Sequence, residues 1–257
     1  MIRVGVNGAC GRMGRAACAA VAADGGLELV AAVSPRHVGE TVEAVTVAGD
    51  IAAFGDADCD VVVDLTSAEV ARSVVPVLVG QGIDVVVGTS GIGDDDVAAL
   101  EVACAGEGAG NVVVAANFAI SAVVLLRLAE IAAPFFDTVE IVELHHDRKV
   151  DAPSGFAAAT AARIAAASSD WAADPTTQES VPGARGAAGP AGIRIHSVRM
   201  RGMVAHQEVI FGAAGQTLTL RQDSYDRASF MPGLLLACTR VGSRPGVTLG
   251  LGPLLDL

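Results

Sequence analysis

A glycine-rich loop separates the first apolar strand of this sequence from its first helix-length segment. The loop reads Gly8-Ala-Cys-Gly11-Arg-Met-Gly14; it follows the strand pattern Ile2–Val6 directly and runs into the segment Arg12–Ala23. Glycines permit a tight turn and a close approach of backbone to pyrophosphate, while a helix N-terminus offers free N–H groups and a positive dipole end. In this context the loop predicts a dinucleotide site, with an ordinary glycine-rich turn as the alternative. The expected contacts are Gly8, Ala9, Cys10, Gly11, Arg12 and Met13.

Strand patterns and helix-length segments alternate through the first half of the chain. The strands are short β-branched runs at 4–6, 27–33, 61–64, 85–87 and 112–115. Helix-length segments lie between them at 12–23, 68–81 and 94–105. Continuous apolar runs of this length are typical of parallel strands covered on both faces. The order therefore predicts an α/β fold, a Rossmann-type doubly wound parallel sheet.

The pattern changes from about residue 118. An apolar helix is expected at 121–133, a strand with period-two alternation at 138–145, and a helix at 155–167. After a loop rich in Pro, Gly and Ala, we expect antiparallel partner strands at 193–200, 204–212 and 216–221. A final helix at 229–241 and a strand at 247–251 restore the earlier alternation. We predict a dinucleotide-binding domain of residues 1–118, to which 229–257 return, and an α+β substrate domain of 119–228 with an open mixed or antiparallel sheet.

Composition and charge exclude several classes of protein. The chain is 52% hydrophobic but only 4% aromatic, which indicates a core of small aliphatic residues. A net charge of −12 opposes binding to nucleic acid, whose phosphates it would repel. The longest apolar region, 112–136, is interrupted by polar and charged residues, and no secretory leader is evident, so no membrane association is expected. Five scattered cysteines without metal-ligand spacing predict a reducing, cytoplasmic location and no metal site.

The end of the second strand bears on the choice of cofactor. NAD-preferring sites usually place a carboxylate there, but this chain has Ser34, Pro35, Arg36 and His37. The side chains of Ser34, Arg36 and His37, together with Arg12, are suited to a 2′-phosphate, so we predict NADPH over NADH; a merely solvated loop is the alternative. Further cofactor contacts are expected at the carboxyl edge of the sheet. They are Gly88, Thr89, Ser90, Ala115, Ala116, Asn117 and Phe118.

The only lysine of the chain lies in an unusual segment. All sixteen other basic side chains are arginines, whereas Lys149 stands in Glu143-Leu-His145-His146-Asp-Arg-Lys149-Val-Asp-Ala-Pro-Ser154-Gly155. An ammonium is a compact, rotatable donor whose pKa can be shifted, which suits proton delivery. The alternatives are chance placement in an arginine-biased composition and, for the histidine pair, a structural or metal-binding role. Ser154 and Gly155 open a helix after a proline and predict an anion site.

With these motifs placed, the whole chain resembles the 4-hydroxy-tetrahydrodipicolinate reductase (dihydrodipicolinate reductase) family. The resemblance rests on residues 8–14, Gly88-Thr-Ser-Gly91, Asn117-Phe-Ala-Ile and, above all, the segment 143–155. It implies reduction of hydroxytetrahydrodipicolinate, a small dicarboxylate, by NADPH or NADH in lysine and diaminopimelate biosynthesis. It also implies a homotetramer built through the sheet of the second domain.

The resemblance implies roles for five residues of the segment 143–155. His145 is expected to be the general acid/base and Lys149 the second proton donor. His146 and the Ser154-Gly155 backbone are expected to hold substrate carboxylates. Consecutive strand residues point to opposite faces, so His145 and His146 would share one role only if the chain turned sharply there.

Four positions depart from the family pattern: Ser34, Ser90, Ala116 and Phe156. At Phe156 the family has a threonine whose hydroxyl would contact the substrate carboxylate, so Phe156 is expected at a substrate-binding position. This change leaves open a related NADPH-dependent reductase of another cyclic imine or dicarboxylate. A non-catalytic nucleotide-binding regulator is a third hypothesis, which the retained His145 and Lys149 oppose.

Overall fold

The computed structural model describes residues 1–257. The chain forms two compact units, one of Met1–Ile120 with Arg227–Leu257 and one of Ser121–Asp226. These junctions differ by two residues from the domain limits predicted at 118 and 229.

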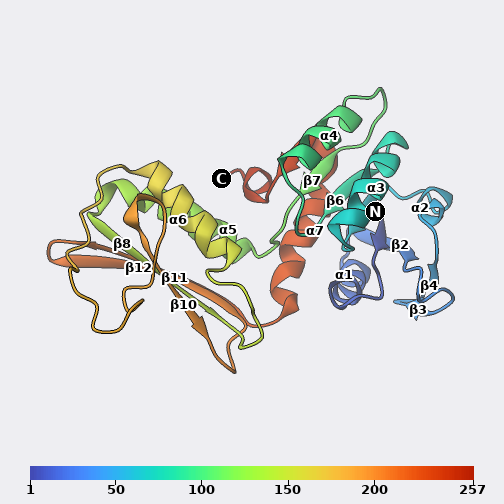
Figure 1. Cartoon of the computed structure of the whole chain (residues 1–257). Helices are drawn as coiled ribbons and strands as arrows, with labels where there is room; N and C mark the ends of the chain where they lie inside the picture. The colour runs from blue at the N-terminus through green and yellow to red at the C-terminus, as the bar shows by residue number, and fades with distance from the viewer. The chain divides into compact units, whose positions relative to one another are not determined.

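The first unit is built on an eight-stranded sheet with the order β13-β7-β6-β5-β1-β2-β4-β3 (Figure 1). Its strands are β1 (Ile2–Asn7), β2 (Leu27–Val33), β3 (Thr41–Val42), β4 (Val45–Ala48), β5 (Val61–Asp64), β6 (Asp84–Val87), β7 (Val112–Val114) and β13 (Val247–Leu249). Its helices are α1 (Arg12–Ala23), α2 (Ala52–Asp56), α3 (Ala68–Gly80), α4 (Asp94–Cys104) and α7 (Met231–Arg240), with short 3-10 turns η3 (Arg227–Phe230), η4 (Val241–Ser243) and η5 (Gly252–Leu255).

The doubly wound sheet predicted from the sequence is confirmed. All strand pairs except β3 with β4 are parallel, and the chain order reverses between β1 and β5. Every residue of β5 is buried, because helices cover both faces of the sheet. In such sheets ligands bind at the carboxyl edge beside the point of reversal. The short elements β3, β4 and α2 were not predicted, since two to five residues are too few to show a period.

The second unit contains a five-stranded sheet with the order β12-β11-β8-β10-β9. Its strands are β8 (Thr138–His145), β9 (Ala187–Ala188), β10 (Arg194–Arg199), β11 (Ala205–Ala213) and β12 (Gln216–Ser224). Its helices are α5 (Ile120–Ala132) and α6 (Gly155–Ala167), with 3-10 turns η1 (Ala133–Phe135) and η2 (Pro190–Gly192).

Alternation along β8 determines which face of this sheet is covered. Val139 and Ile141 are buried and pack in one cluster with Leu125 and Ala129 of α5 and Ile164 of α6. Figure 1 shows these two helices lying along the same face of the sheet. The same face therefore receives the alternate residues Glu143 and His145 at the end of β8.

One predicted strand pairing is wrong. We expected β10 to be an antiparallel partner; it is antiparallel to the short strand β9 but runs parallel to β8, with Arg194 opposite Glu140 and Arg199 opposite His145. The connection between them contains α6 and the loop up to Gly192, which is long enough to return the chain to the starting end of β8. The pairings of β11 with β8 and β12 are antiparallel, so the sheet is mixed.

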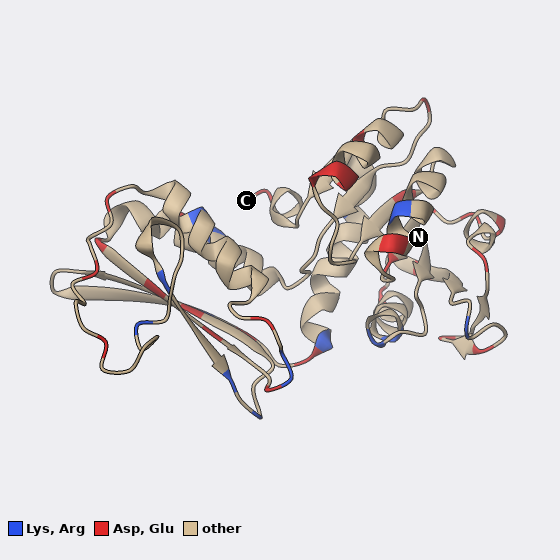
Figure 2. Cartoon of the chain, viewed as in Figure 1, with Lys and Arg blue, Asp and Glu red and all other residues tan.

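Acidic residues are distributed over both units, as the red segments in Figure 2 show. None of the helices combines the length and the apolar character that crossing a membrane requires.

Candidate functional site

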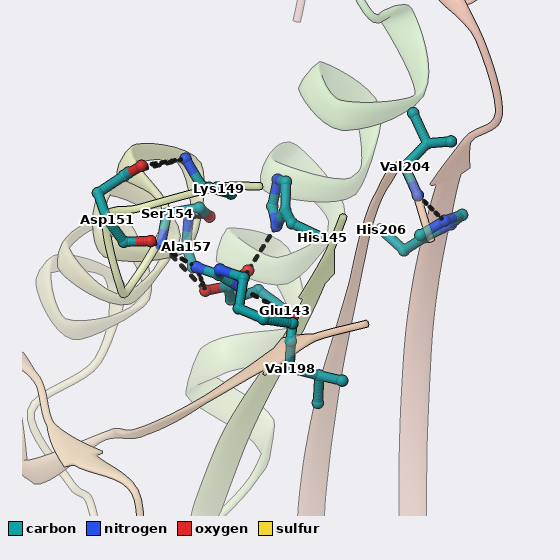
Figure 3. Close-up of polar contacts among 10 residues, drawn as sticks. Glu143, His145, Lys149, Asp151, Ser154, Ala157, Val198, Val204 and His206 are labelled. Atoms are coloured by element: carbon teal, nitrogen blue, oxygen red, sulfur yellow. Dashed lines mark hydrogen bonds and ion pairs between the residues drawn. The ribbon is translucent and has the colours of Figure 1, made fainter. Parts of the chain in front are cut away.

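Glu143 connects the parts of the motif at the end of β8. Its side chain is fully buried, and its carboxylate oxygen Oε2 lies 2.5 Å from Nδ1 of His145 (Figure 3). The other oxygen, Oε1, accepts a 3.1 Å hydrogen bond from the backbone N–H of Ser154. The carboxylate therefore contacts both the histidine and the start of α6.

Arg199, at the end of the parallel neighbour β10, forms a two-pronged ion pair with Glu143. Its Nη1 donates to Oε2 at 2.8 Å and its Nη2 to Oε1 at 2.7 Å. Nη2 also donates to the backbone carbonyl of Asp151 at 2.7 Å. Planar guanidinium and carboxylate groups match in this geometry, which makes the contact both strong and directional.

The pKa values of Glu143 and His145 are both lowered. Burial alone would raise the pKa of Glu143, but hydrogen bonds from Arg199, Ser197 and His145 together outweigh it and lower the pKa to about 2. Burial lowers the pKa of His145, with the charges of Lys149 and Arg199 adding to the effect and Glu143 opposing it. Glu143 is thus an anion that only accepts hydrogen bonds, so Nδ1 of His145 carries the proton between them.

Lys149 forms an ion pair within the loop that follows β8. Its Nζ donates to both carboxylate oxygens of Asp151, at 2.9 and 2.7 Å. The Lys149 side chain is 20% exposed and that of Asp151 is 58% exposed. The lysine charge is close enough to His145 to lower its pKa, so the two predicted proton donors are neighbours.

The start of α6 has unpaired backbone donors. Ser154 is the N-cap, and its hydroxyl oxygen accepts from the N–H of Ala157 at 3.2 Å. The N–H of Ser154 is already bonded to Glu143, whereas those of Gly155 and Phe156 have no hydrogen-bond partner within the chain. Two free N–H groups at a helix N-terminus suit an anion such as a carboxylate.

Two further predicted substrate-binding residues are Phe156, the second residue of α6, and His146, which directly follows β8. The Phe156 ring is half-buried and packs against the apolar core of the second unit. β8 ends at His145, so strand alternation no longer orients His146, whose backbone carbonyl accepts from the N–H of Lys149. Nδ1 of His146 is buried without a hydrogen-bond partner.

The glycine loop of the first unit has the backbone geometry that a pyrophosphate requires. Gly8 has a φ of 83°, a left-handed conformation that side chains disfavour. A Cβ on Gly14 would lie 2.1 Å from the carbonyl oxygen of Gly8, so only glycine fits there. Gly11 caps α1 without a side chain, and Arg12 and Gly11 are exposed beside it. These observations fit a dinucleotide whose phosphates approach the backbone.

A cavity of about 310 Å³ adjoins this loop at the carboxyl edge of the sheet. Gly8, Val33, Pro35 and Asp50 are among the residues that line it. Ser34 is buried beside it, and its hydroxyl lies 3.0 Å from Nδ1 of His37.

Two arginines near this cavity are free of partners. The side chains of Arg36 and Arg12 are exposed and form no hydrogen bond or ion pair within the chain. Ser34 and Arg36 are therefore adjacent in sequence to Pro35 in the cavity wall, while Arg12 follows the glycine loop that contains the lining residue Gly8.

The buried Asp64 organises the neighbouring strand ends. Its carboxylate accepts hydrogen bonds from Nδ2 of Asn7 at 2.7 Å, from Oγ1 of Thr66 at 2.8 Å and from Oγ1 of Thr89 at 3.1 Å. Three loops at the carboxyl edge are thereby joined. Gly88 lies against Leu65, because an added Cβ would meet that side chain at 2.6 Å.

The last predicted cofactor segment follows β7. Ala115 and Phe118 are buried, Ala116 is exposed, and Ser90 is exposed in the preceding loop. Oδ1 of Asn117 accepts from the N–H of Ala119 at 2.9 Å, which fixes the turn into α5.

Comparison with known proteins follows the same division into two parts. The family model described as dihydrodipicolinate reductase, N-terminus, matches residues 2–118, and the one described as dihydrodipicolinate reductase, C-terminus, matches residues 121–255. The chain belongs to the dihydrodipicolinate reductase family.

Whole-chain relatives of this family agree with that assignment. The chain is 48% identical to 4-hydroxy-tetrahydrodipicolinate reductase of Nocardia farcinica, with 100% of this chain and 99% of the relative covered. It is 45% identical to the protein of that name from Mycobacterium sp. strain KMS, with both chains fully covered. A solved dipicolinate-bound dihydrodipicolinate reductase from Paenisporosarcina sp. TG-14 matches with a TM-score of 0.86 and 36% identity, over 98% of this chain and 99% of that one.

Membership in the dihydrodipicolinate reductase family implies a nicotinamide dinucleotide, and the glycine loop fits one. The predicted site residues fall into two groups, each within one unit. Residues 8–13, 34, 36, 88–90 and 115–118 lie at loops of the first unit, and residues 145, 146, 149 and 154–156 lie in the second.

Several polar residues of these sites were not predicted from the sequence. Asp151, Arg199 and Asp64, with its partners Asn7 and Thr66, were not singled out, and Glu143 was given no role. Glu143 could have been found from its spacing of two residues from His145, which places both on one face of a strand. Asp64 could have been found as a charged residue that ends a buried strand.

Proposed function

We propose that this chain reduces 4-hydroxy-tetrahydrodipicolinate to tetrahydrodipicolinate with a nicotinamide cofactor, in lysine and diaminopimelate biosynthesis. One observation carries the proposal. His145, Lys149 and the free N–H groups at the start of α6 are gathered at the end of β8, in a chain that matches the family over both halves. The hypothesis of a related reductase for another imine rested on Phe156 alone. Because that ring packs against the core, the phenylalanine has a structural explanation that does not require another substrate.

The dicarboxylate substrate requires fixed donors for its negative charges. We assign one carboxylate to the N–H groups of Gly155 and Phe156, which replace the predicted pair Ser154-Gly155 because Ser154 N is occupied. Lys149 and His146 are the cationic and polar side chains assigned to carboxylate binding beside them. A carboxylate held by a helix start and an ammonium receives two charge-assisted contacts.

The two titratable groups then supply protons. The cofactor, when bound, supplies a hydride to the substrate. In the neutral His145, Nδ1 carries the proton and donates it in a hydrogen bond to Glu143, which leaves Nε2 as the atom that takes up and delivers a proton. Lys149 is assigned as the second donor, since its ammonium neighbours that imidazole.

NADPH is the preferred cofactor in this proposal. No carboxylate ends β2, where NAD-preferring sites usually carry one. Arg36 and Arg12 are instead exposed and unpaired, and a 2′-phosphate is the group of NADPH that guanidinium recognises best. The contacts assigned to the remainder of the cofactor are those at residues 8–13, 34, 88–90 and 115–118.

A cytoplasmic homotetramer completes the proposal. Helices α5 and α6 cover one face of the five-stranded sheet, and the other face carries the half-buried apolar side chains Val142, Leu144, Val198 and Ile210. An uncovered sheet face with apolar side chains is suited to pairing between copies of the chain.

An assay of NADPH oxidation with enzymatically generated 4-hydroxy-tetrahydrodipicolinate tests the proposed activity. We expect rapid oxidation that depends on the substrate and is abolished in a His145→Gln variant. Absence of oxidation with either NADPH or NADH, in a protein that still binds the dinucleotide, would refute the proposed substrate.

A further inference from the structure

The buried ion pair of Glu143 and Arg199 has more contacts than packing requires. Besides the Ser197 hydroxyl, which also acts on this carboxylate, each Glu143 oxygen accepts one Arg199 donor and one donor from the motif: Oε2 from His145, and Oε1 from Ser154. Arg199 adds the carbonyl of Asp151, two residues after Lys149. No other residue of the chain contacts both the histidine and the start of α6 through side-chain hydrogen bonds.

We propose that Glu143 and Arg199 are positioning residues that fix the tautomer of His145 and the spacing between this histidine and the carboxylate-binding start of α6. The proposal rests on the acid–base role assigned to His145 above. Neither side chain is proposed to touch the substrate. Glu143 is fully buried, and both of its carboxylate oxygens already accept hydrogen bonds from the protein.

The first part of the proposal concerns the proton of the imidazole. A carboxylate anion only accepts hydrogen bonds, so contact with Nδ1 requires the neutral ring to carry its proton there. Nε2 is then unprotonated in the neutral ring and has no hydrogen-bond partner within the chain. The tautomer of a histidine is set in this way by the bond that its other nitrogen makes.

The second part concerns the loop that carries Lys149. Residues 146–153 link the end of β8 to α6 without regular secondary structure, and their only internal backbone bond joins Lys149 N to His146 O. Arg199 holds the Asp151 carbonyl and Glu143 holds Ser154 N, so one ion pair fixes the far end of the loop. Because Glu143 also holds His145, the same pair fixes the near end.

Three charged groups on the elements around His145 act on its pKa and enter the expected pH dependence. They are Glu143 on its own strand, Lys149 in the following loop and Arg199 on β10; on the other side, β11 places the uncharged Ala205 opposite it. Glu143 is the one group among these that raises the pKa of His145. Removing its charge therefore lowers that pKa further.

A Glu143→Gln variant separates positioning from simple structural support. If protonated His145 is the acid, activity is lost as pH rises through its pKa, so the high-pH limb of kcat should move to lower pH in the variant. We expect kcat to fall by roughly 10²-fold or more, within the range that a placed general acid contributes. KM should rise as well, because Ser154 loses its anchor.

Glu140→Gln is the matched control. Glu140 lies on the same strand and is likewise paired with an arginine and a histidine, Arg185 and His196, but on the opposite face of the sheet. With assembly checked by gel filtration and active protein counted by NADPH titration, this control should retain the wild-type pH profile. An unshifted high-pH limb in Glu143→Gln, or an equal shift in both variants, would overturn the proposal.

A measurement on the unaltered protein covers the case in which Glu143→Gln does not fold. In ¹⁵N NMR of histidine-labelled full-length protein above the His145 pKa, the His145 signal, assigned with His145→Gln, should show a proton on Nδ1. A proton on Nε2 would overturn the proposal while leaving the acid–base role of His145 intact. Conversely, wild-type turnover in His145→Gln would refute the acid–base role whatever the tautomer.

Discussion

Lys149 donates from Nζ to both carboxylate oxygens of Asp151, at 2.9 and 2.7 Å. Both residues belong to the loop between β8 and α6, and Asp151 is the more exposed of the two. A substrate carboxylate that binds Lys149 must therefore share or displace a carboxylate that already belongs to the site. The ion pair with Asp151 keeps the Lys149 ammonium ordered before the substrate binds.

The first prediction concerns the choice of lysine at this position. Lys149→Arg keeps the positive charge and its attraction to Asp151, but a guanidinium does not release a proton near neutral pH. We expect kcat to fall by about 10² to 10⁴, with an unchanged melting temperature. The reciprocal change at the exposed neighbour, Arg148→Lys, should leave kcat unaltered. Turnover of Lys149→Arg within a few-fold of wild type would remove Lys149 from the mechanism.

A second prediction compares two glycines of the dinucleotide loop. A Cβ on Gly14 would lie 2.1 Å from the Gly8 carbonyl oxygen and 2.8 Å from atoms of Ala9, whereas one on Gly11 would meet only the Gly8 carbonyl oxygen, at 3.2 Å. Gly14→Ala must displace the loop backbone, so its Kd for NADPH should rise by more than tenfold. Gly11→Ala should bind NADPH more tightly than Gly14→Ala. Fluorescence titration measures both, and the reverse order would contradict the assignment of the loop.

Cofactor preference is the third prediction. If Arg36 binds the 2′-phosphate, Arg36→Ala should raise KM for NADPH about 10- to 100-fold, as expected for one charge-assisted contact, and leave KM for NADH nearly unchanged. Arg244→Ala, at a partly exposed arginine paired with Asp256, serves as the control. Equal losses with both cofactors would show that Arg36 does not recognise the phosphate.

Phe156 provides a fourth prediction with opposite effects on activity and stability. The N–H of Phe156 is unchanged in Phe156→Thr, and the new hydroxyl adds a donor beside the substrate carboxylate. We expect kcat/KM to rise, by at most about 100-fold, which is the upper value for a hydrogen bond to a charged group. Loss of the half-buried ring should cost roughly 1–2 kcal/mol of unfolding free energy. A fall in kcat/KM without loss of stability would contradict this account of the ring.

The first unit was largely predictable because its signals are local. β-branched runs that alternate with helix-length segments specify parallel strands, and Gly8 to Gly14 marks the turn after the first of them. The elements β3, β4 and α2 escaped because their order depends on contacts with β2 rather than on a period of their own. The direction of β10 escaped because a crossover and a long hairpin-like loop look alike in sequence.

Only those candidate-site residues that lie close together in the sequence could be grouped from the sequence alone. The segment 143–155 contains His145, Lys149 and the start of α6, so sequence proximity sufficed for these. Arg199 is 56 residues from Glu143, and only the parallel pairing of β8 with β10 brings the two together. The free N–H donors are those of Gly155 and Phe156, and not those of Ser154 and Gly155, because the Glu143 carboxylate already accepts from the N–H of Ser154.

Transfer of deuterium from the cofactor tests the central claim most directly. NADPH deuterated at either face of C4 is incubated with the protein and enzymatically generated 4-hydroxy-tetrahydrodipicolinate, and the product is analysed by mass spectrometry. The account predicts that one of the two labelled cofactors yields tetrahydrodipicolinate carrying one deuterium, and that His145→Gln, while still binding NADPH, yields almost none. A product without deuterium from either cofactor, or full labelling by His145→Gln at the wild-type rate, would contradict it.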